Sequence, residues 1–313
     1  MILSVSRRTD IPNYYSDWFY NRVKEGFVYV KNPMNIHQVS RIDISPDVVD
    51  CIVFWTKNPK AMLGRLDELS AYNYYFQFTL TGYGKDMESN VPHKKEIMIP
   101  VFHELSNKIG KEKVIWRYDP IIFTGKYDMD YHLKAFEQIA GALNGYTEKC
   151  VISFVDVYAK NMKNMEAIDS YQVDKEELVN FASKLAQIAR DNHMTMGSCA
   201  ENIDLDKCGI EHNCCIDKEL IERLIGCKLK VHKDKNQRGE CGCMESMEIG
   251  TYNTCQNGCK YCYANYSEES VRKNCEKYDP LSPILCGKLE EEDKVTERKV
   301  KSLREAQMTL FDM

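Results

Sequence analysis

The sequence predicts an α/β protein, and within that class a (β/α) barrel, because short apolar runs alternate with longer segments of helical period. The runs are mostly continuous and rich in β-branched and aromatic residues, which is typical of strands buried on both faces of a parallel sheet. The expected strands are Ile2–Val5, Val48–Trp55, Tyr74–Leu80, Val114–Trp116, Cys150–Val157, Met194–Gly197 and Met247–Tyr252. The expected helices are Tyr14–Glu25, Pro59–Leu69, Lys94–Ile109, Tyr131–Leu143, Lys175–Asn192 and Asp217–Ile225. This alternation suits a closed barrel at least as well as an open sheet.

Polar and ionisable residues follow the expected strands in order along the chain. The strand ends carry Ser6-Arg7-Arg8-Thr9-Asp10, then Thr56-Lys57-Asn58, then Thr79 and Thr81, then Arg117-Tyr118-Asp119, then Asp156 and Tyr158, and finally Cys199 with Glu201-Asn202. Barrel enzymes place their sites at the carboxyl ends of successive parallel strands. The candidates for catalysis, or for holding a cofactor or substrate, are therefore Arg7, Arg8, Asp10, Lys57, Arg117 and Asp119. The alternative is that these are ordinary residues of exposed turns.

Composition limits the class of protein. The 313 residues allow one large domain or two ordinary ones, and the 43% hydrophobic share suits a chain with a sizeable core. No apolar run approaches the roughly 18 residues of a membrane span, and no basic region leads into an apolar one at the start of the chain. We therefore expect a cytoplasmic protein that makes no membrane contact. The net charge of −5 argues against a generally basic nucleic-acid coat, but not against a local patch.

The cysteines are concentrated late in the chain. Of the 14 cysteines, Cys51 and Cys150 alone lie in the first 198 residues, and the others lie between Cys199 and Cys286. A cysteine block without a secretion signal indicates metal binding rather than a disulfide framework.

The sharpest motif is Cys255-Gln-Asn-Gly-Cys259-Lys-Tyr-Cys262. Three thiols at this spacing suit three irons of a [4Fe–4S] cube and leave the fourth iron open to chelate a small molecule. Gly258 lets the loop turn tightly around the cube, and Tyr261 can cover it. A zinc site would favour paired Cys-x-x-Cys knuckles, and a bacterial ferredoxin run would have spacings of two, two and three.

This motif resembles the signature of the radical S-adenosylmethionine superfamily, Cys-x₃-Cys-x-aromatic-Cys. The resemblance implies that Cys255, Cys259 and Cys262 hold the cube and that the open iron binds S-adenosylmethionine. An electron from a donor would then yield a 5′-deoxyadenosyl radical that abstracts hydrogen from a substrate. The superfamily carries the motif after its first barrel strand. Here it lies near residue 260, which predicts a circular permutation with Met247–Tyr252 as the displaced first strand.

The chain is also similar to a family known as domain of unknown function 1848. The similarity is carried by Ser6–Pro12, Phe54–Pro59, Phe78–Gly82, Trp116–Pro120 and the Cys255 motif. The stretch Arg117–Ile121 further resembles part of spore photoproduct lyase, a radical enzyme of DNA repair.

We divide the chain into three parts. Residues 1–198 are the main part of the barrel, residues 199–287 are a cysteine-rich iron–sulfur region with the displaced strand, and residues 288–313 are a charged tail.

A second cysteine group precedes the first. Because many radical enzymes hold an auxiliary cluster in a cysteine-rich extension, we expect a second [4Fe–4S] cluster on Cys199, Cys215, Cys241 and Cys243, with Cys214 a near-equal alternative to Cys215. A zinc ion with His212 or His232 as a ligand, and free buried thiols, are the competing interpretations. Cys275 and Cys286 are unassigned.

Two segments indicate partners. The basic stretch Lys228–Arg238 could follow a phosphate backbone, although such a run is often a solvated loop. The final residues Gln307–Phe311 resemble the bacterial sliding-clamp motif Gln-x-x-Leu-Phe, with Leu310 and Phe311 as anchors in a hydrophobic pocket. They could instead cover the barrel's own surface. We expect the charged segment before them to be mobile or a solvated helix.

The sequence therefore predicts a radical S-adenosylmethionine-type enzyme with a role in DNA repair or nucleic-acid modification. The competing prediction is a non-catalytic iron–sulfur sensor on DNA, recruited by the clamp. A third interpretation is a protein with structural zinc alone.

Overall fold

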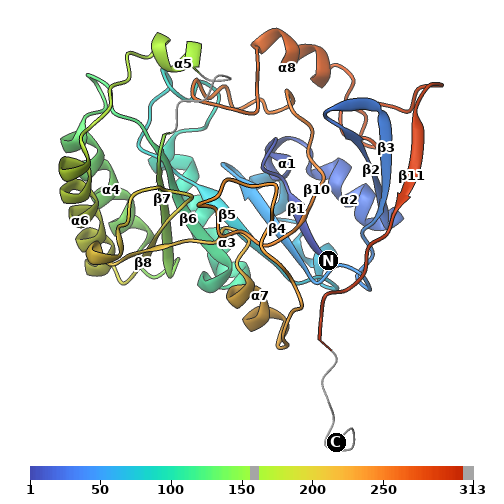
Figure 1. Ribbon diagram of the computed structural model, residues 1–313, viewed down its shortest axis with the longest axis horizontal. Coiled ribbons are helices and arrows are strands. Elements are labelled where there is room, and N and C mark those ends of the chain that lie inside the picture. Colours follow the sequence, from blue (N-terminus) through green and yellow to red (C-terminus); the bar gives the residue numbers. More distant parts are fainter. Residues whose placement is uncertain (156–161, 306–313) are drawn as a thin grey trace, which may run out of the picture.

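The computed structural model describes residues 1–155 and 162–305, and its centre is one eight-stranded sheet (Figure 1). All neighbouring strands in this sheet are parallel. The strands, in spatial order, are β10 (Met247–Glu248), β1 (Ile2–Val5), β4 (Cys51–Thr56), β5 (Tyr74–Thr79), β6 (Val114–Ile121), β7 (Lys149–Phe154), β8 (Thr195–Ser198) and β9 (Ile210–His212). The predicted α/β class is confirmed, and each of the seven expected strands has a counterpart in this sheet.

Five of the six expected helical segments contain a helix, and the structure adds short helices that were not expected, at Ile11–Tyr14, Met162–Ala167 and Glu268–Cys275. The helices are α1 (Ile11–Tyr14), α2 (Ser16–Glu25), α3 (Ile99–Ile109), α4 (Met129–Leu143), α5 (Met162–Ala167), α6 (Lys175–Asp191), α7 (Lys218–Ile225) and α8 (Glu268–Cys275). The helix expected over Pro59–Leu69 is wrong: the chain forms two short 3₁₀ turns there, on either side of Gly64. Glycine disfavours a continuous helix because it loses more backbone entropy than other residues. Aspartates cap the long helices, since Asp128 accepts from the Tyr131 N–H and Asp174 accepts from two N–H groups.

The two faces of the sheet are covered differently. Residues such as Phe76 and Trp116 point to one face and pack against α2, α3, α4 and α6. The alternate residues, such as Tyr75 and Ile115, pack against the segment that runs from Ala200 to Met244 and includes α7. In Figure 1 this later segment, coloured yellow-brown to orange, passes across the sheet, with α7 near its lower edge. The cysteine-rich region is therefore a layer on the sheet and not a separate extension.

The closed barrel expected from the sequence is not confirmed, because the sheet is open. Its edges are β9, which pairs with β8, and β10, which pairs with β1. The side chains of Ile216, Leu220 and Leu229 fill the face that would become the barrel interior. The expected displaced strand does lie beside β1, with Leu3 opposite Met247 and Ser4 opposite Glu248.

A second, three-stranded sheet was missed by the sequence analysis. It contains β2 (Phe27–Asn32), β3 (Asn35–Asp43) and β11 (Lys294–Arg298), and the last is parallel to β3. Figure 1 shows these strands from opposite ends of the chain side by side at the right. Within residues 288–305 the tail thus contains the strand Lys294–Arg298 and no helix. The clamp-like peptide Gln307–Phe311, and Asp156 and Tyr158, lie outside the described residues.

In the parts of the chain that the structure describes, no helix combines the length and the apolarity that crossing a bilayer requires.

A buried histidine couples the packing of α4 to pH. His132 is fully buried, its Nε2 donates to the Ile122 carbonyl at 3.0 Å, and its Nδ1 lies 2.8 Å from the Tyr118 hydroxyl. A carbonyl can only accept, so the neutral ring accepts at Nδ1. Burial lowers the pKa of this imidazole to about 4 from its usual 6.5.

We predict that this histidine makes the protein less stable as the pH falls from about 6.5 toward 4, by about 3 kcal/mol in all. Over this range the unfolded chain binds a proton that the folded chain excludes, so folding is increasingly disfavoured. Urea unfolding across the range measures the slope. His132→Gln should be less stable at neutral pH but should show a flatter dependence, whereas the exposed His212→Gln should retain the wild-type slope. Equal slopes in all three proteins would contradict this prediction.

Candidate metal centre at the strand ends

The Cys255–Cys262 loop follows β10 and is fixed to the segment after β5. The Lys260 N–H donates to the Met87 carbonyl at 3.0 Å, and the Asn90 N–H donates to the Asn257 carbonyl at 3.2 Å. Gly258 has φ of +66°, and a Cβ at this position would come within 2.1 Å of Ser89 Oγ. Glycine is therefore required both for the turn and for the close approach.

The three thiols of this loop share one region. Burial raises the pKa of each thiol, and at Cys259 raises it to about 12, where Lys57 acts in the opposite direction. Cys262 and Cys259 both contribute to the raised pKa of Cys255, so the three sulfurs influence one another. Thiols so arranged lose their protons readily only when a metal takes the place of the protons.

The sulfurs of this loop are not arranged as a closed single-ion site. Among residues 1–155 and 162–305, no three cysteine sulfurs all lie within 4.8 Å of one another. Zinc–sulfur bonds of about 2.3 Å would hold the sulfurs of a tetrahedral site about 3.8 Å apart. At least one pair of sulfurs in this loop is therefore farther apart than a tetrahedral zinc site requires.

Asp10 connects the loop to two strands. Its carboxylate accepts from Thr56 Oγ1 at 2.7 Å, from the Lys57 N–H at 2.8 Å and from Asn257 Nδ2 at 3.0 Å. The same Asn257 amide lies 3.4 Å from the sulfur of Cys255. Burial raises the pKa of this carboxyl, and these donors oppose the shift. Asp10 is thus a positioning residue that joins the ends of β1 and β4 to the cysteine loop.

The most connected residue of the site, Glu88, was not predicted. Its fully buried carboxylate accepts from Lys57 Nζ at 2.7 Å and from Thr81 Oγ1 at 2.9 Å, and also from Lys94 Nζ and the Tyr261 hydroxyl. Burial would raise the pKa of Glu88, but Lys57 and Lys94 lower it to about 2. A single glutamate in a loop without a motif carries no signal in the sequence.

Arg7 and Arg8 border the loop together with aromatic rings. The Arg7 guanidinium lies 5.6 Å from the Trp55 ring centre, and that of Arg8 lies 4.9 Å from the Tyr252 ring centre. Arg7 also makes ion pairs with Glu248 at 3.7 Å and with Asp234 at 4.0 Å. Next to them, Tyr263 and Tyr266 are 47% and 55% exposed, and the Tyr263 hydroxyl donates to the Arg7 carbonyl at 2.8 Å. The result is an exposed surface of arginines and rings beside Cys262.

Arg117 and Asp119 belong to the other cysteine group. Arg117 is 5% exposed, pairs with Asp119, and donates from Nη1 to the sulfur of Cys215 at 2.7 Å. The sulfurs of Cys199 and Cys215 are 3.4 Å apart. Cys199, Cys215, Cys241 and Cys243 lie in one packed cluster, so the structure brings the four predicted cysteines together.

Cys214, the alternative to Cys215, lies against the turn that carries Cys241 and Cys243. Its sulfur would lie 2.5 Å from a Cβ at Gly242, between those two cysteines. His212 and His232, the zinc candidates, are exposed. Cys275 lies 3.2 Å from the Tyr15 hydroxyl, and Cys286 is buried in the main core.

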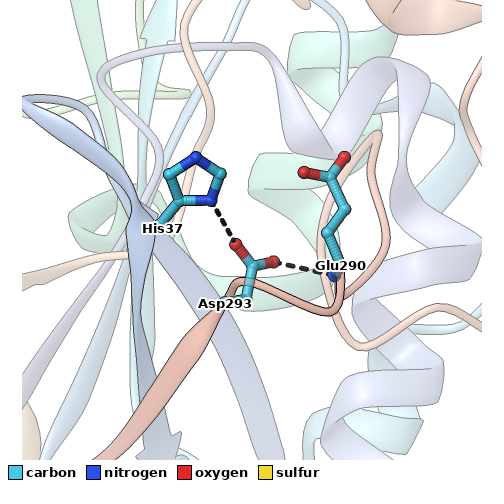
Figure 2. A group of neighbouring side chains, drawn as sticks. All are labelled: His37, Glu290 and Asp293. Carbon is cyan, nitrogen blue, oxygen red and sulfur yellow. Dashed lines mark hydrogen bonds and ion pairs between the residues drawn. The ribbon is translucent and has the colours of Figure 1, made fainter.

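Figure 2 shows the one group of metal-ligating side chains that lie within 4.8 Å of one another in the described part of the chain, His37, Glu290 and Asp293. His37 Nδ1 is 3.4 Å from Asp293, and Lys31 forms ion pairs with both carboxylates. The lysine already balances these acids, and the group is partly exposed, so we assign no metal to it.

We predict that Glu88→Gln lowers the free energy of unfolding by about 3–5 kcal/mol, because it leaves two lysines without their buried counter-charge. Urea unfolding measures this loss. The matched control is Glu96→Gln, at an exposed position in the turn that begins at Lys94, and it should change stability by less than about 0.5 kcal/mol. Similar values for the two variants would show that the buried network adds no stability.

A family model described as a domain of unknown function (DUF1848) matches residues 2–264, a range that includes both cysteine groups and the strand-end residues. Neither a curated protein nor a solved structure matches the chain.

Proposed function

The chain belongs to the DUF1848 family, and we propose that it is a radical S-adenosylmethionine-type iron–sulfur enzyme that acts on a nucleic-acid substrate. The proposed catalytic cluster is a [4Fe–4S] cube on Cys255, Cys259 and Cys262. Its open iron would take S-adenosylmethionine, and an electron donor would complete the system.

The observation that carries this proposal is the place of the cysteine loop in the sheet. If β10 is counted first, the sheet continues as β1, β4, β5, β6, β7 and β8, each parallel to the one before. The Cys-x₃-Cys-x-Tyr-Cys loop then follows the first strand, the position that it holds in the radical S-adenosylmethionine superfamily. This order supports a permuted and opened form of that barrel.

Cys255, Cys259 and Cys262 would hold the cube, whose open iron would bind S-adenosylmethionine and whose stored electron would drive its reductive cleavage for radical chemistry on the substrate. The protein's own residues would hold and shield this chemistry. The Asn257 side-chain amide donates a hydrogen bond to the sulfur of Cys255, and the Ala264 N–H donates one to the sulfur of Cys262. The Lys57 ammonium lowers the pKa of Cys259 against the effect of burial and so favours its thiolate. Tyr261, 8% exposed, excludes water on the side of Glu88.

We predict that anaerobically reconstituted wild type forms a cluster whose reduced electron paramagnetic resonance spectrum changes with S-adenosylmethionine, and that it releases 5′-deoxyadenosine. Cys259→Ala should lose both properties, because two thiolates do not hold a cube with one open iron. Cys227→Ala, outside both cysteine groups, is the control and should keep them. An intact cluster that ignores S-adenosylmethionine would favour the sensor instead of the enzyme.

The surface beside Cys262 supports a nucleic-acid substrate. Tyr263 and Tyr266 are 47% and 55% exposed, and aromatic side chains of this kind are those on which bases stack; Arg7 and Arg8 supply positive charge beside them. The exposed Lys233 and Lys235 lie on either side of Asp234. Asp234 joins this loop to the site, since it pairs with Arg7 and its N–H donates to the Cys243 carbonyl at 2.9 Å. Rings for bases and cations for phosphates are thus adjacent.

We predict that the protein binds a labelled single-stranded DNA oligonucleotide in fluorescence anisotropy, with affinity that falls as salt rises. Tyr263→Ala/Tyr266→Ala should weaken binding by about 1–3 kcal/mol for each base that stacks. The matched control is Tyr263→Phe/Tyr266→Phe, which keeps both rings and should bind about as well as wild type. Equal binding by the alanine and phenylalanine variants would rule out stacking on these tyrosines. The clamp-binding peptide stays a prediction of the sequence.

A further inference from the structure

We propose that Cys199, Cys215, Cys241 and Cys243 hold a second [4Fe–4S] cluster on the inner face of the sheet, and that Arg117 positions it. This inference does not depend on S-adenosylmethionine chemistry and goes beyond the proposed function. It also gives Arg117 a role other than holding the cofactor or substrate of the first centre.

The four thiols converge from three separate segments of the chain. Cys199 directly follows β8, Cys215 precedes α7, and Cys241 and Cys243 flank Gly242 in a later turn. The sulfurs of Cys199 and Cys215 are 3.4 Å apart, and all four cysteines lie in one packed cluster on this face of the sheet. Four thiols from distant segments in one buried place are a complete ligand set for a cube.

Hydrogen-bond donors point at these sulfurs. Arg117 Nη1 lies 2.7 Å from Cys215 Sγ, Asn213 Nδ2 lies 3.5 Å from the same sulfur, and the Ile216 N–H lies 3.4 Å from Cys243 Sγ. Donors around the sulfurs stabilise thiolates and raise the reduction potential of a cluster. Neutral thiols that serve packing alone need no such donors.

Cys51 illustrates the difference. It is fully buried in the same apolar layer, and its sulfur has one long contact, 3.7 Å, with the adjacent Ile52 carbonyl. Among the described residues, no N–H group donates a hydrogen bond to this sulfur. Cys51 is therefore a packing cysteine, and the four converging cysteines differ from it in both contacts and charge.

Charge further separates the group from a set of free thiols. Arg117 is buried beside Asp119, yet its Nη1 is turned to Cys215 and to Gln77 Oε1, at 3.3 Å. A cube held by four thiolates is anionic, and the Arg117 guanidinium would offset part of that charge.

The separation of the sulfurs matches neither metal group throughout, so metal analysis has to distinguish the two. Cys199 and Cys215 are 3.4 Å apart, and in the described ranges no third cysteine sulfur lies within 4.8 Å of both. A tetrahedral zinc ion holds its sulfurs about 3.8 Å apart, whereas a cube holds each sulfur on a separate iron and therefore farther from the others. Because four thiolates ligate all four irons, this centre would pass electrons and would not chelate a small molecule.

The first test is the metal content of the full-length protein after anaerobic reconstitution. We expect about eight irons and eight sulfides per chain in wild type, and about four of each in Cys241→Ser/Cys243→Ser. The double variant should keep the spectral change with S-adenosylmethionine. The control Cys214→Ser, next in sequence to a proposed ligand but directed at Gly242, should keep about eight irons. The proposal would be overturned if wild type held only about four irons or one zinc per chain. It would also be overturned if the double variant held as much iron as wild type.

The second test does not require the loss of a ligand and applies even if the double variant does not fold. Arg117→Gln should lower the midpoint potential of the cluster that does not respond to S-adenosylmethionine, because it removes a positive charge beside the thiolates, and Arg117→Lys should restore part of the shift. The potential of the responsive cluster should not change. Equal potentials in all three proteins, or a shift of the responsive cluster alone, would overturn the role of Arg117. Failure of the proposed function would look different: about eight irons without any response to S-adenosylmethionine.

Discussion

A parallel sheet has to bury both of its faces, and in this chain the two faces are buried by different kinds of segment. Helices cover one face, as is usual for alternating strands and helices. On the other face lies the cysteine-rich segment with α7, in the space that a closed barrel would fill with its own strand side chains. Because the cysteine-rich segment occupies this face, the sheet stays open and its edge strands are short. The same arrangement places the second cysteine group on the sheet.

The inner face changes character along the strands. Near the amino ends it is apolar, with Ile2, Tyr75 and Ile115, and two residues further along the same strands it becomes polar, with Ser4, Gln77 and Arg117. The change occurs at the end of the sheet where the strand-end loops gather. Side chains that alternate along a strand share a face, so a step of two residues is enough to move from packing to chemistry. The fold therefore supplies an apolar base and a polar rim for both cysteine groups.

Much of this arrangement could be predicted from the sequence, because strand runs and cysteine spacing are local signals. The strands, the neighbourhood of β10 and β1, and the convergence of Cys199 with Cys215, Cys241 and Cys243 were expected and are present. Closure of the barrel could not be judged, since it depends on what occupies the inner face. Strand β11 is exposed and charged, without the apolar alternation that identifies a strand, and pairing with β3 alone defines it. Glu88 was missed because its partners come from four other segments of the chain.

The buried charges are arranged in the same way at both cysteine groups. Each thiol group has a cation beside it, Lys57 near Cys259 and Arg117 at Cys215, and each of these cations is also paired with a carboxylate, Glu88 or Asp119. A lone cation in such surroundings would lose much of its charge or draw in water. The carboxylates therefore hold the cations charged and in place before any thiolate is present. If the thiols bind metal as proposed, the negative charge of the thiolates would form next to a positive group that is already in place. Glu88 and Asp119 would then serve to hold that positive group beside the sulfurs.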